Sequence, residues 1–229
     1  MDIALAIMVK QPVPGRVKTR LCPPLTHEQA AEIYRCFLLD KMAQVRRVLA
    51  GAAYLAFTPQ EAEEFFRDLA SEAFSLIPQE GSNLGERLDR LSARLLAAGH
   101  PGVVIIDSDT PNLPDHYLAE AVERIGDRGT DAIFGPAEDG GYYLVGLRRP
   151  LSALFQGITW STPVVLEQTL RHAAAAGLRV HLLPPWFDVD TAKDLERLAD
   201  DLAKNESPAR HTQAFLQVLM RQQADGKRW

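Results

Sequence analysis

A chain of 229 residues is long enough for one large α/β domain or two small ones, and 46% hydrophobic residues is the composition of a soluble globular protein. The net charge of −5 argues against general nucleic-acid binding, which requires a broad basic surface. Apolar runs are only strand-sized and no leader segment is recognisable, so we expect a cytoplasmic protein that does not contact a membrane.

Short apolar runs alternate with segments of helical periodicity along the whole chain. The expected strands cover residues 2–9, 51–58, 73–78, 102–107, 130–135, 142–147 and 178–183. Three helices are expected in the first half of the chain: at 26–49, from 58 onward, and from the loop 79–87 to about residue 99. Four more are expected after it: from the loop 107–114 to about residue 124, from 160–163 to 177, from 191 onward, and from about 207. Helix-capping signals stand at Thr26 with Gln29, at Thr58-Pro59 with Glu61, at 160–163 and at Thr191.

This alternation predicts a three-layer α/β/α fold, in which helices cover both faces of a largely parallel sheet. The runs 130–135 and 142–147 follow each other too closely for a crossover helix, so one of the two is expected to be antiparallel. The prediction is therefore a mixed, mostly parallel sheet of about seven strands. No repeat or linker is present, which favours one domain over residues 1–229, with a C-terminal helical tail at about 207–229.

Four unusual loops follow apolar strands, at 10–24, 107–114, 135–141 and 184–191. Ligands of open α/β sheets bind beyond the carboxyl ends of the strands, so all four loops could meet in one crevice. The first loop has four cations and no acid between residues 10 and 20. Its candidate phosphate-binding residues are Lys10, Gly15, Arg16, Lys18 and Arg20, where the glycine allows close backbone approach and the cations surround a phosphate. The alternative is a solvated basic loop; a P-loop motif is absent.

The second loop places two carboxylates, Asp107 and Asp109, at the end of the most apolar strand. Such a pair can hold one Mg²⁺ or Mn²⁺, a hard cation that binds oxygen ligands and bridges phosphates. We expect Asp107 to be partly buried and structural, and Asp109 to be the metal ligand; the alternative is an Asx-turn. A strand that ends in DxD also resembles the nucleophile motif of haloacid-dehalogenase-type phosphatases, but Pro111 stands where that motif has Thr or Val.

The third and fourth loops carry further acids. Glu138, Asp139, Gly140 and Gly141 are candidate substrate-binding residues, because tandem glycines expose backbone N–H groups and the acids can accept hydrogen bonds; the alternative is a tight hairpin turn. Asp188 and Asp190 precede a helix, so a metal-ligand role stands beside a helix-capping role. Both roles can hold together.

Five motifs taken together resemble the nucleotide-diphospho-sugar transferase superfamily, which has the Rossmann-like GT-A fold. They are K-x-P-x-P-G-R-V-K-T-R-L (10–21), S-D-T-P-x-L-P (108–114), G-P-A-E-D-G-G-Y-Y-L-x-G-L (135–147), W-S-T-P-x-V-L (160–166) and D-V-D-T-x-x-D-L (188–195). The chain is most similar to the bacterial "transferase 1" family associated with radical-SAM and selenodomain proteins. It is more distantly similar to molybdenum-cofactor and 2-phospholactate nucleotidylyltransferases.

The resemblance implies that Arg16, Lys18 and Arg20 hold nucleotide phosphates and that Asp109 and Asp190 bind Mg²⁺ or Mn²⁺. The first loop departs from the glycine-rich pattern of nucleotidylyltransferases, because prolines stand where that pattern has glycines. We expect a metal-dependent transferase, with Asp109, Lys18 and Asp139 as catalytic residues, that moves a sugar from a nucleotide-sugar to a small-molecule acceptor. The alternatives are nucleotidyl transfer from a nucleoside triphosphate, phosphate hydrolysis, or nucleotide binding without catalysis.

Overall fold

The computed structural model describes residues 2–48, 51–204 and 209–224. Within these residues one mixed sheet has the strand order β3-β2-β1-β4-β6-β5-β7. Its strands are β1 (Ala4–Lys10), β2 (Ala53–Thr58), β3 (Ser75–Pro78), β4 (Val103–Ile106), β5 (Ala132–Pro136), β6 (Tyr142–Leu147) and β7 (Val180–Leu182). β6 runs antiparallel to β4 and β5, and all other neighbours are parallel. The predicted mixed sheet is confirmed.

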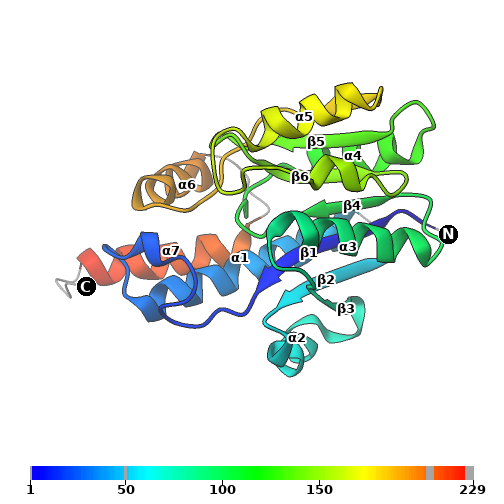
Figure 1. The fold of residues 1–229 in the computed structure, drawn as a ribbon. Helices are drawn as coiled ribbons and strands as arrows, with labels where there is room; N and C mark the ends of the chain where they lie inside the picture. The colour runs from blue at the N-terminus through cyan, green and yellow to red at the C-terminus, as the bar shows by residue number, and fades with distance from the viewer. Residues whose placement is uncertain (1, 49–50, 205–208, 225–229) are drawn as a thin grey trace.

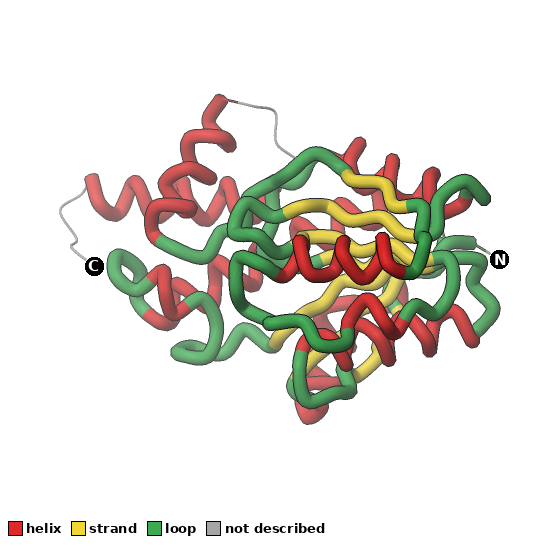
Figure 2. The backbone as a smooth tube through the Cα atoms, turned by 45° about the horizontal axis from the view of Figure 1, so that its top comes forward, coloured by secondary structure: helices red, strands yellow, loops and turns green. Residues whose placement is uncertain are grey.

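Helices cover both faces of this sheet (Figures 1 and 2). They are α1 (His27–Val48), α2 (Glu63–Ala70), α3 (Leu84–Ala97), α4 (Asp115–Gly126), α5 (Val165–Ala175), α6 (Ala192–Lys204) and α7 (Arg210–Ala224). Side chains alternate between the faces along β1: Leu5 and Ile7 pack in the core with α1, α2 and α4, whereas Ala4 and Ala6 pack in the core with α3 and α5.

Two of the predicted helix starts form as expected. Thr26 and Gln29 make a reciprocal capping box, in which the Thr26 N–H donates to Gln29 Oε1 (2.8 Å) and the Gln29 N–H donates to Thr26 Oγ1 (3.2 Å). Thr191 caps α6 through a similar exchange with Asp194. The helix expected over 26–49 ends at Val48, and residue 49 lies outside the described residues.

Two other helix starts differ from the prediction. After Pro59 the chain first makes a 3₁₀ turn, η2 (Gln60–Ala62), and no side chain caps it, so Thr58 is not a capping residue. The segment 160–163 does not cap α5, which begins at Val165. Ser161 has φ 62° and the Thr162 hydroxyl donates to the Thr159 carbonyl (2.6 Å), so these residues close a turn of their own before the helix can start.

The last helix, α7, lies beside α1 at the end of the molecule where β1 finishes (Figure 1). Buried Asp40 of α1 accepts hydrogen bonds from the His211 and Thr212 N–H groups (2.9 and 2.8 Å) and from the Thr212 hydroxyl (2.7 Å). This carboxylate satisfies the free N–H groups at the start of α7. The rest of the predicted tail, 207–208 and 225–229, lies outside the described residues. No described helix is both long and apolar enough to cross a lipid bilayer.

Candidate functional site

A cleft of about 380 Å³ opens at the carboxyl ends of β1, β2 and β4. Residues of three predicted loops line it: Arg16 to Arg20, Ser108 with Asp109, and Asp190. Tyr34, Thr58, Gln79 and Arg87 complete its walls. The loops 10–24, 107–114 and 184–191 therefore meet in one crevice, as the rule for open α/β sheets requires. No residue of 135–141 is among the lining residues.

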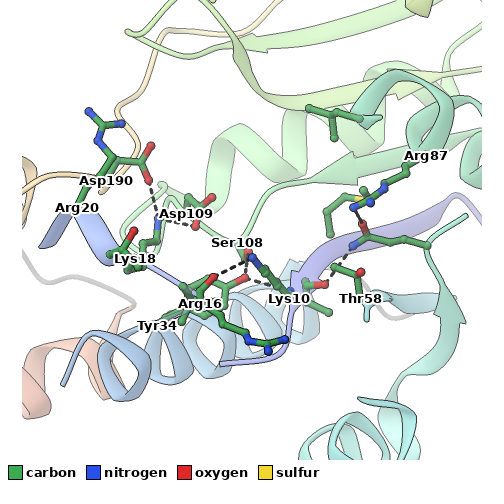
Figure 3. A pocket seen from close by; sticks show the side chains of 16 residues that line it. Lys10, Arg16, Lys18, Arg20, Tyr34, Thr58, Arg87, Ser108, Asp109 and Asp190 are labelled. Atoms are coloured by element: carbon green, nitrogen blue, oxygen red, sulfur yellow. Dashed lines mark hydrogen bonds and ion pairs between the residues drawn. The ribbon is translucent and has the colours of Figure 1, made fainter. Parts of the chain in front are cut away.

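Lys18 lies between the two predicted metal ligands (Figure 3). Its Nζ is 2.6 Å from Oδ1 of Asp109 and 2.8 Å from Oδ1 of Asp190. The Lys18 side chain is only 5% exposed, whereas those of Asp109 and Asp190 are 39% and 43% exposed. Burial alone would lower the pKa of Lys18, but the charges of Asp109 and Asp190 outweigh it and hold that pKa above its ordinary value. The ammonium is therefore charged at neutral pH.

The backbone conformation of Lys18 is unusual, because its φ of 47° lies in the left-handed region that non-glycine residues rarely adopt. The next residues form the 3₁₀ turn η1 (Thr19–Leu21), whose Leu21 is buried in the core. Strained residues of this kind concentrate at functional sites, where the surrounding structure holds them in place. Here the strain aims one lysine of a basic loop at two acids.

The other cations of the first loop stay at the surface. Lys10, Arg16 and Arg20 are exposed and border the cleft, and Lys10 Nζ donates to the carbonyl of Arg16 (2.8 Å), which joins the start of the loop to its middle. Gly15 has φ 73° and lies outside the lining, so its part is to turn the loop. These three long, positively charged side chains border an open cleft, so they have the charge and the reach to contact an anion.

Tyr34 of α1 is a member of the site that the sequence did not reveal. Its hydroxyl lies 2.8 Å from Ser108 Oγ and accepts a hydrogen bond from the Lys10 N–H (3.2 Å) (Figure 3). Burial raises the pKa of Tyr34, and the charge of Asp109 raises it further, so the phenol stays neutral. Because Tyr34 falls on the apolar face of a helix, its pattern is that of a core residue. It joins the first loop to the loop that carries Asp109.

Gln79 and Arg87 form the far end of the cleft and were also missed. The Gln79 amide donates to the carbonyls of Ala56 (2.7 Å) and Val9 (3.1 Å), and its Oε1 accepts from Arg87 Nη1 (3.3 Å). Arg87 also donates through Nε to the Gly81 carbonyl (3.1 Å). Gln79 directly follows β3, so the same carboxyl-end rule that selected the other loops could have selected this one.

Behind the cleft lies a polar cluster of the buried Lys41 with the half-buried Asp107 and Asp188. Lys41 is fully buried, its Nζ is 4.0 Å from Oδ1 of Asp107, and it donates to Gln44 Oε1 (3.2 Å). Burial lowers the pKa of Lys41 to about 8, although Asp107 and Asp188 act against that shift. Burial raises the pKa of both carboxyl groups, and the charge of Asp107 raises that of Asp188 further, so the pair can share a proton.

Asp107 itself is 22% exposed and accepts a hydrogen bond from the Thr110 hydroxyl (2.7 Å). The structure thus places Asp107 inward and Asp109 on the cleft, which is the arrangement expected from their positions at the end of a buried strand. Val189 between Asp188 and Asp190 donates its N–H to the Asp109 carbonyl (2.9 Å). This hydrogen bond holds the two acidic loops side by side.

The segment 138–141 is a tight turn outside the cleft. Glu138 forms a two-bond ion pair with Arg197 (2.6 and 2.9 Å), and Asp139 Oδ1 accepts from the Gly141 N–H (2.8 Å). Arg197 lowers the pKa of Glu138. Gly140 has φ 92°, and its N–H donates to the Ala137 carbonyl (3.1 Å). A substrate-binding role for Glu138, Asp139, Gly140 and Gly141 stays a prediction.

Gly140→Ala is expected to destabilise the protein by about 2–5 kcal/mol, the sum of the left-handed backbone cost and an overpacking cost. A Cβ at this position would lie 2.0 Å from the Pro163 carbonyl oxygen, so the turn or the segment before α5 must move. Gly157→Ala is the matched control, because Gly157 has φ 66° and no atom within 4 Å of its Cβ position. Urea unfolding should show a larger loss for Gly140→Ala; equal losses would contradict this packing.

The acids at the cleft fit a hard divalent cation that binds together with phosphates. No group of three or more metal-binding side chains occurs among the described residues. Mg²⁺, however, is ordinarily held by one or two carboxylates plus substrate phosphates and water, and Asp109 and Asp190 supply two carboxylates at the open side of the cleft. A metal site here would therefore be completed by the ligand that occupies the cleft.

Comparisons with known proteins agree with this fold. The family model of an uncharacterized protein conserved in bacteria (DUF2064) matches residues 41–162. A protein of Desulfovibrio desulfuricans G20, provisionally named a nucleotide-diphospho-sugar transferase, is 34% identical with a TM-score of 0.88, over 97% of this chain and 98% of that one. No curated protein matches significantly.

Two more distant structures share the fold alone. A CMP:2-keto-3-deoxy-manno-octonic acid synthetase in complex with CTP is 12% identical, with a TM-score of 0.53 over 89% of this chain and 99% of that one. Rv0371c of Mycobacterium tuberculosis H37Rv in complex with manganese is 15% identical, with a TM-score of 0.51 over 88% and 100%. Because the family model covers more than half of the chain, and a protein 34% identical matches almost all of it, the chain belongs to the bacterial DUF2064 family and has the fold of nucleotide-diphospho-sugar transferases.

Proposed function

We propose that this protein is a metal-dependent transferase that binds a nucleotide donor in the cleft at the carboxyl ends of β1, β2 and β4. The observation that carries the proposal is the contact of Lys18 with both Asp109 and Asp190 at the mouth of a cleft bordered by Lys10, Arg16 and Arg20. Two acids and several cations in one cleft suit a phosphate with a bound metal ion better than they suit a metal ion alone or a phosphate alone. The cleft volume lies in the range of small-molecule sites.

The two ends of the cleft suggest how the donor lies. The cationic loop and the two acids at one end would hold the phosphates. Arg87 and Thr58 lie at the other end (Figure 3), and Gln79 is hydrogen-bonded to Arg87 there, so this end offers hydrogen-bonding groups for a nucleoside. Gln79 uses both amide hydrogens on backbone carbonyls, which fix the orientation of its side chain.

In this arrangement Lys18, Arg16 and Arg20 would share the negative charge that develops on the leaving phosphate. The chemistry that Mg²⁺ or Mn²⁺ supplies when bound to Asp109 and Asp190 is neutralisation of the same charge. A nucleotide-sugar donor would release a nucleoside diphosphate and transfer its sugar to a small-molecule acceptor. Asp139 is the candidate base for that acceptor, with Glu138, Gly140 and Gly141 beside it.

Nucleotidyl transfer from a nucleoside triphosphate, with pyrophosphate as the leaving group, is the second candidate. It is favoured by the synthetase of the same fold whose structure contains CTP. The same cradle of cations and acids would serve both reactions, because each leaving group is a pair of linked phosphates. The first loop of this chain lacks the glycine-rich pattern of nucleotidylyltransferases, and this difference favours the nucleotide-sugar as donor.

A thermal-shift screen tests the proposal. UDP-, GDP-, ADP- and CDP-linked sugars and the four nucleoside triphosphates are each measured with and without Mg²⁺ or Mn²⁺. A ligand at 100 times its Kd should stabilise the protein by about 2.7 kcal/mol, and we expect a metal-dependent shift with one nucleotide. A shift with a nucleotide-sugar favours sugar transfer and a shift with a triphosphate favours nucleotidyl transfer. No shift with any nucleotide would refute the proposal.

A further inference from the structure

Lys18 occupies the space between the two proposed metal ligands. Its Nζ contacts Oδ1 of Asp109 at 2.6 Å and Oδ1 of Asp190 at 2.8 Å. Mg²⁺ bound to the same two oxygens would lie about 2.0–2.1 Å from each, which is in the same space between the two carboxylates. An ammonium and a divalent cation cannot share that space, since both are positive and their radii overlap. Binding of a metal ion by these two oxygens therefore requires Lys18 to move.

The structure holds the ammonium firmly in this position. The rings of Tyr34 and Phe37 lie 5.9 and 5.8 Å from Nζ, at the edge of the range for cation–π attraction. The left-handed backbone of Lys18 and the buried Leu21 three residues later, whose N–H donates to the Lys18 carbonyl (3.0 Å), direct the side chain inward. The lysine also neutralises one of the two carboxylate charges, so a metal ion that arrives alone meets a weaker attraction as well as an occupied position.

A phosphate in the cleft supplies what Lys18 needs in order to leave. An ammonium has three donors, and the two carboxylates use two of them. Phosphate oxygens brought in beside Arg16 and Arg20 can accept from Lys18 while the carboxylates turn to the metal. Every charge then keeps a partner: the ammonium pairs with phosphate, and the two acids pair with the divalent cation.

We propose that Lys18 occupies the metal position of the nucleotide-free protein and excludes the divalent cation until a nucleotide phosphate draws its ammonium away. This inference rests on the metal site of the proposed function and adds an order of binding, in which the nucleotide binds before the metal ion. The protein binds metal weakly alone and tightly with a nucleotide, and by linkage the metal tightens the nucleotide by the same factor.

The test uses Mn²⁺ alone, without nucleotide, and measures its Kd by calorimetry and by electron paramagnetic resonance of free Mn²⁺. Lys18→Met keeps the length and apolar stem of the side chain and removes the ammonium. We expect it to bind Mn²⁺ at least about tenfold more tightly than the wild type, within the usual range of coupling between sites. Lys10→Met is the matched control, since Lys10 carries the same charge in the same loop but binds the Arg16 carbonyl. It should change the Kd by less than about threefold.

The double variant Lys18→Met with Asp109→Asn should lose the gain in affinity, which assigns it to the acid pair. If Lys18→Met does not fold, Lys18→Gly replaces it, because glycine adopts a φ of 47° without strain. Equal or weaker Mn²⁺ binding by the lysine variant overturns the inference. The nucleotide screen is a separate measurement: a positive screen without the Mn²⁺ gain leaves the proposed function and refutes the exclusion of metal by Lys18. A Mn²⁺ gain without a shift for any nucleotide leaves the exclusion of metal by Lys18, but it refutes both the release of Lys18 by a nucleotide and the proposed function.

Discussion

Asp109→Asn is expected to weaken Mn²⁺ binding at least about 100-fold in the presence of the nucleotide found by the screen, and to abolish metal-dependent turnover. The change removes one of two negative ligands and leaves an amide of the same shape. Changes to residues that merely support a ligand commonly cost 10- to 100-fold in metal affinity, so the loss of a direct ligand should cost at least as much. Calorimetric titration of Mn²⁺ into the nucleotide-saturated variant measures the loss.

The fold should survive this change, because Asp109 is 39% exposed at the open side of the cleft. Far-UV circular dichroism and urea unfolding check that point. Asp68→Asn on the exposed face of α2 is the control for the same chemical change away from the cleft, and it should bind Mn²⁺ as the wild type does. If Asp109→Asn binds Mn²⁺ within threefold of the wild type, the metal site lies elsewhere.

Lys41→Met is expected to destabilise the protein by about 3–5 kcal/mol at pH 7.5, the usual cost of removing one partner from a buried ion pair. Lys41 is fully buried and is the cation nearest to Asp107, at 4.0 Å. Without it, the negative charge that Asp107 and Asp188 share loses its neighbouring cation in a poorly hydrated environment. Urea unfolding at several pH values measures the effect, with the exposed Lys193→Met as a control that should change stability by no more than about 0.5 kcal/mol.

The pH dependence distinguishes this cluster from ordinary packing loss. The pKa values of Asp107 and Asp188 are raised in the folded state, so folding binds protons and these groups favour the folded protein as the pH falls. The deficit of Lys41→Met should therefore shrink from pH 7.5 to pH 5. For Lys41 the sign is opposite: its folded pKa of about 8 lies below the ordinary 10.5, so wild-type stability gains from this group as the pH rises between those values.

The variant should lack that alkaline gain. A deficit that is equal at pH 5 and pH 7.5 would mean that Lys41 acts through packing alone. A variant as stable as the wild type at both values would mean that the two carboxyl groups need no cation, because they share a proton without it.

Much of the fold could be predicted because its signals are local. Strands buried on both faces appear as apolar runs, and the short connection between β5 and β6 leaves no room for a crossover helix, so the antiparallel strand follows from chain length alone. The capping boxes at Thr26 and Thr191 are likewise contacts between residues three apart. The start of α5 was mispredicted because Thr162 bonds back to Thr159, and that turn competes with the helix.

The candidate site could be predicted only in part, because sequence signals report local neighbours and not contacts between distant segments. Asp109 and Asp190 stand out because they follow apolar segments. Asp109 lies two residues further past the strand end than Asp107, and that position favours Asp109 as the residue on the cleft. Tyr34 and Lys41 lie on α1, where one resembles a core residue and the other a surface lysine. The spacing of residue types along a helix does not indicate which loop packs against that helix.

By itself, then, the sequence determined the seven strands, the end of the sheet where the cleft lies, and the residue types collected there, because each depends on periodicity or on neighbours along the chain. Only the tertiary structure decided the contacts among them. Lys18 and Asp190 are 172 positions apart, yet they meet because strand order sets β1 beside β4 and brings the loop before α6 onto the same edge. Glu138 is turned toward Arg197 by the packing of α6. Such contacts follow from the order in which strands pair, which no local pattern encodes.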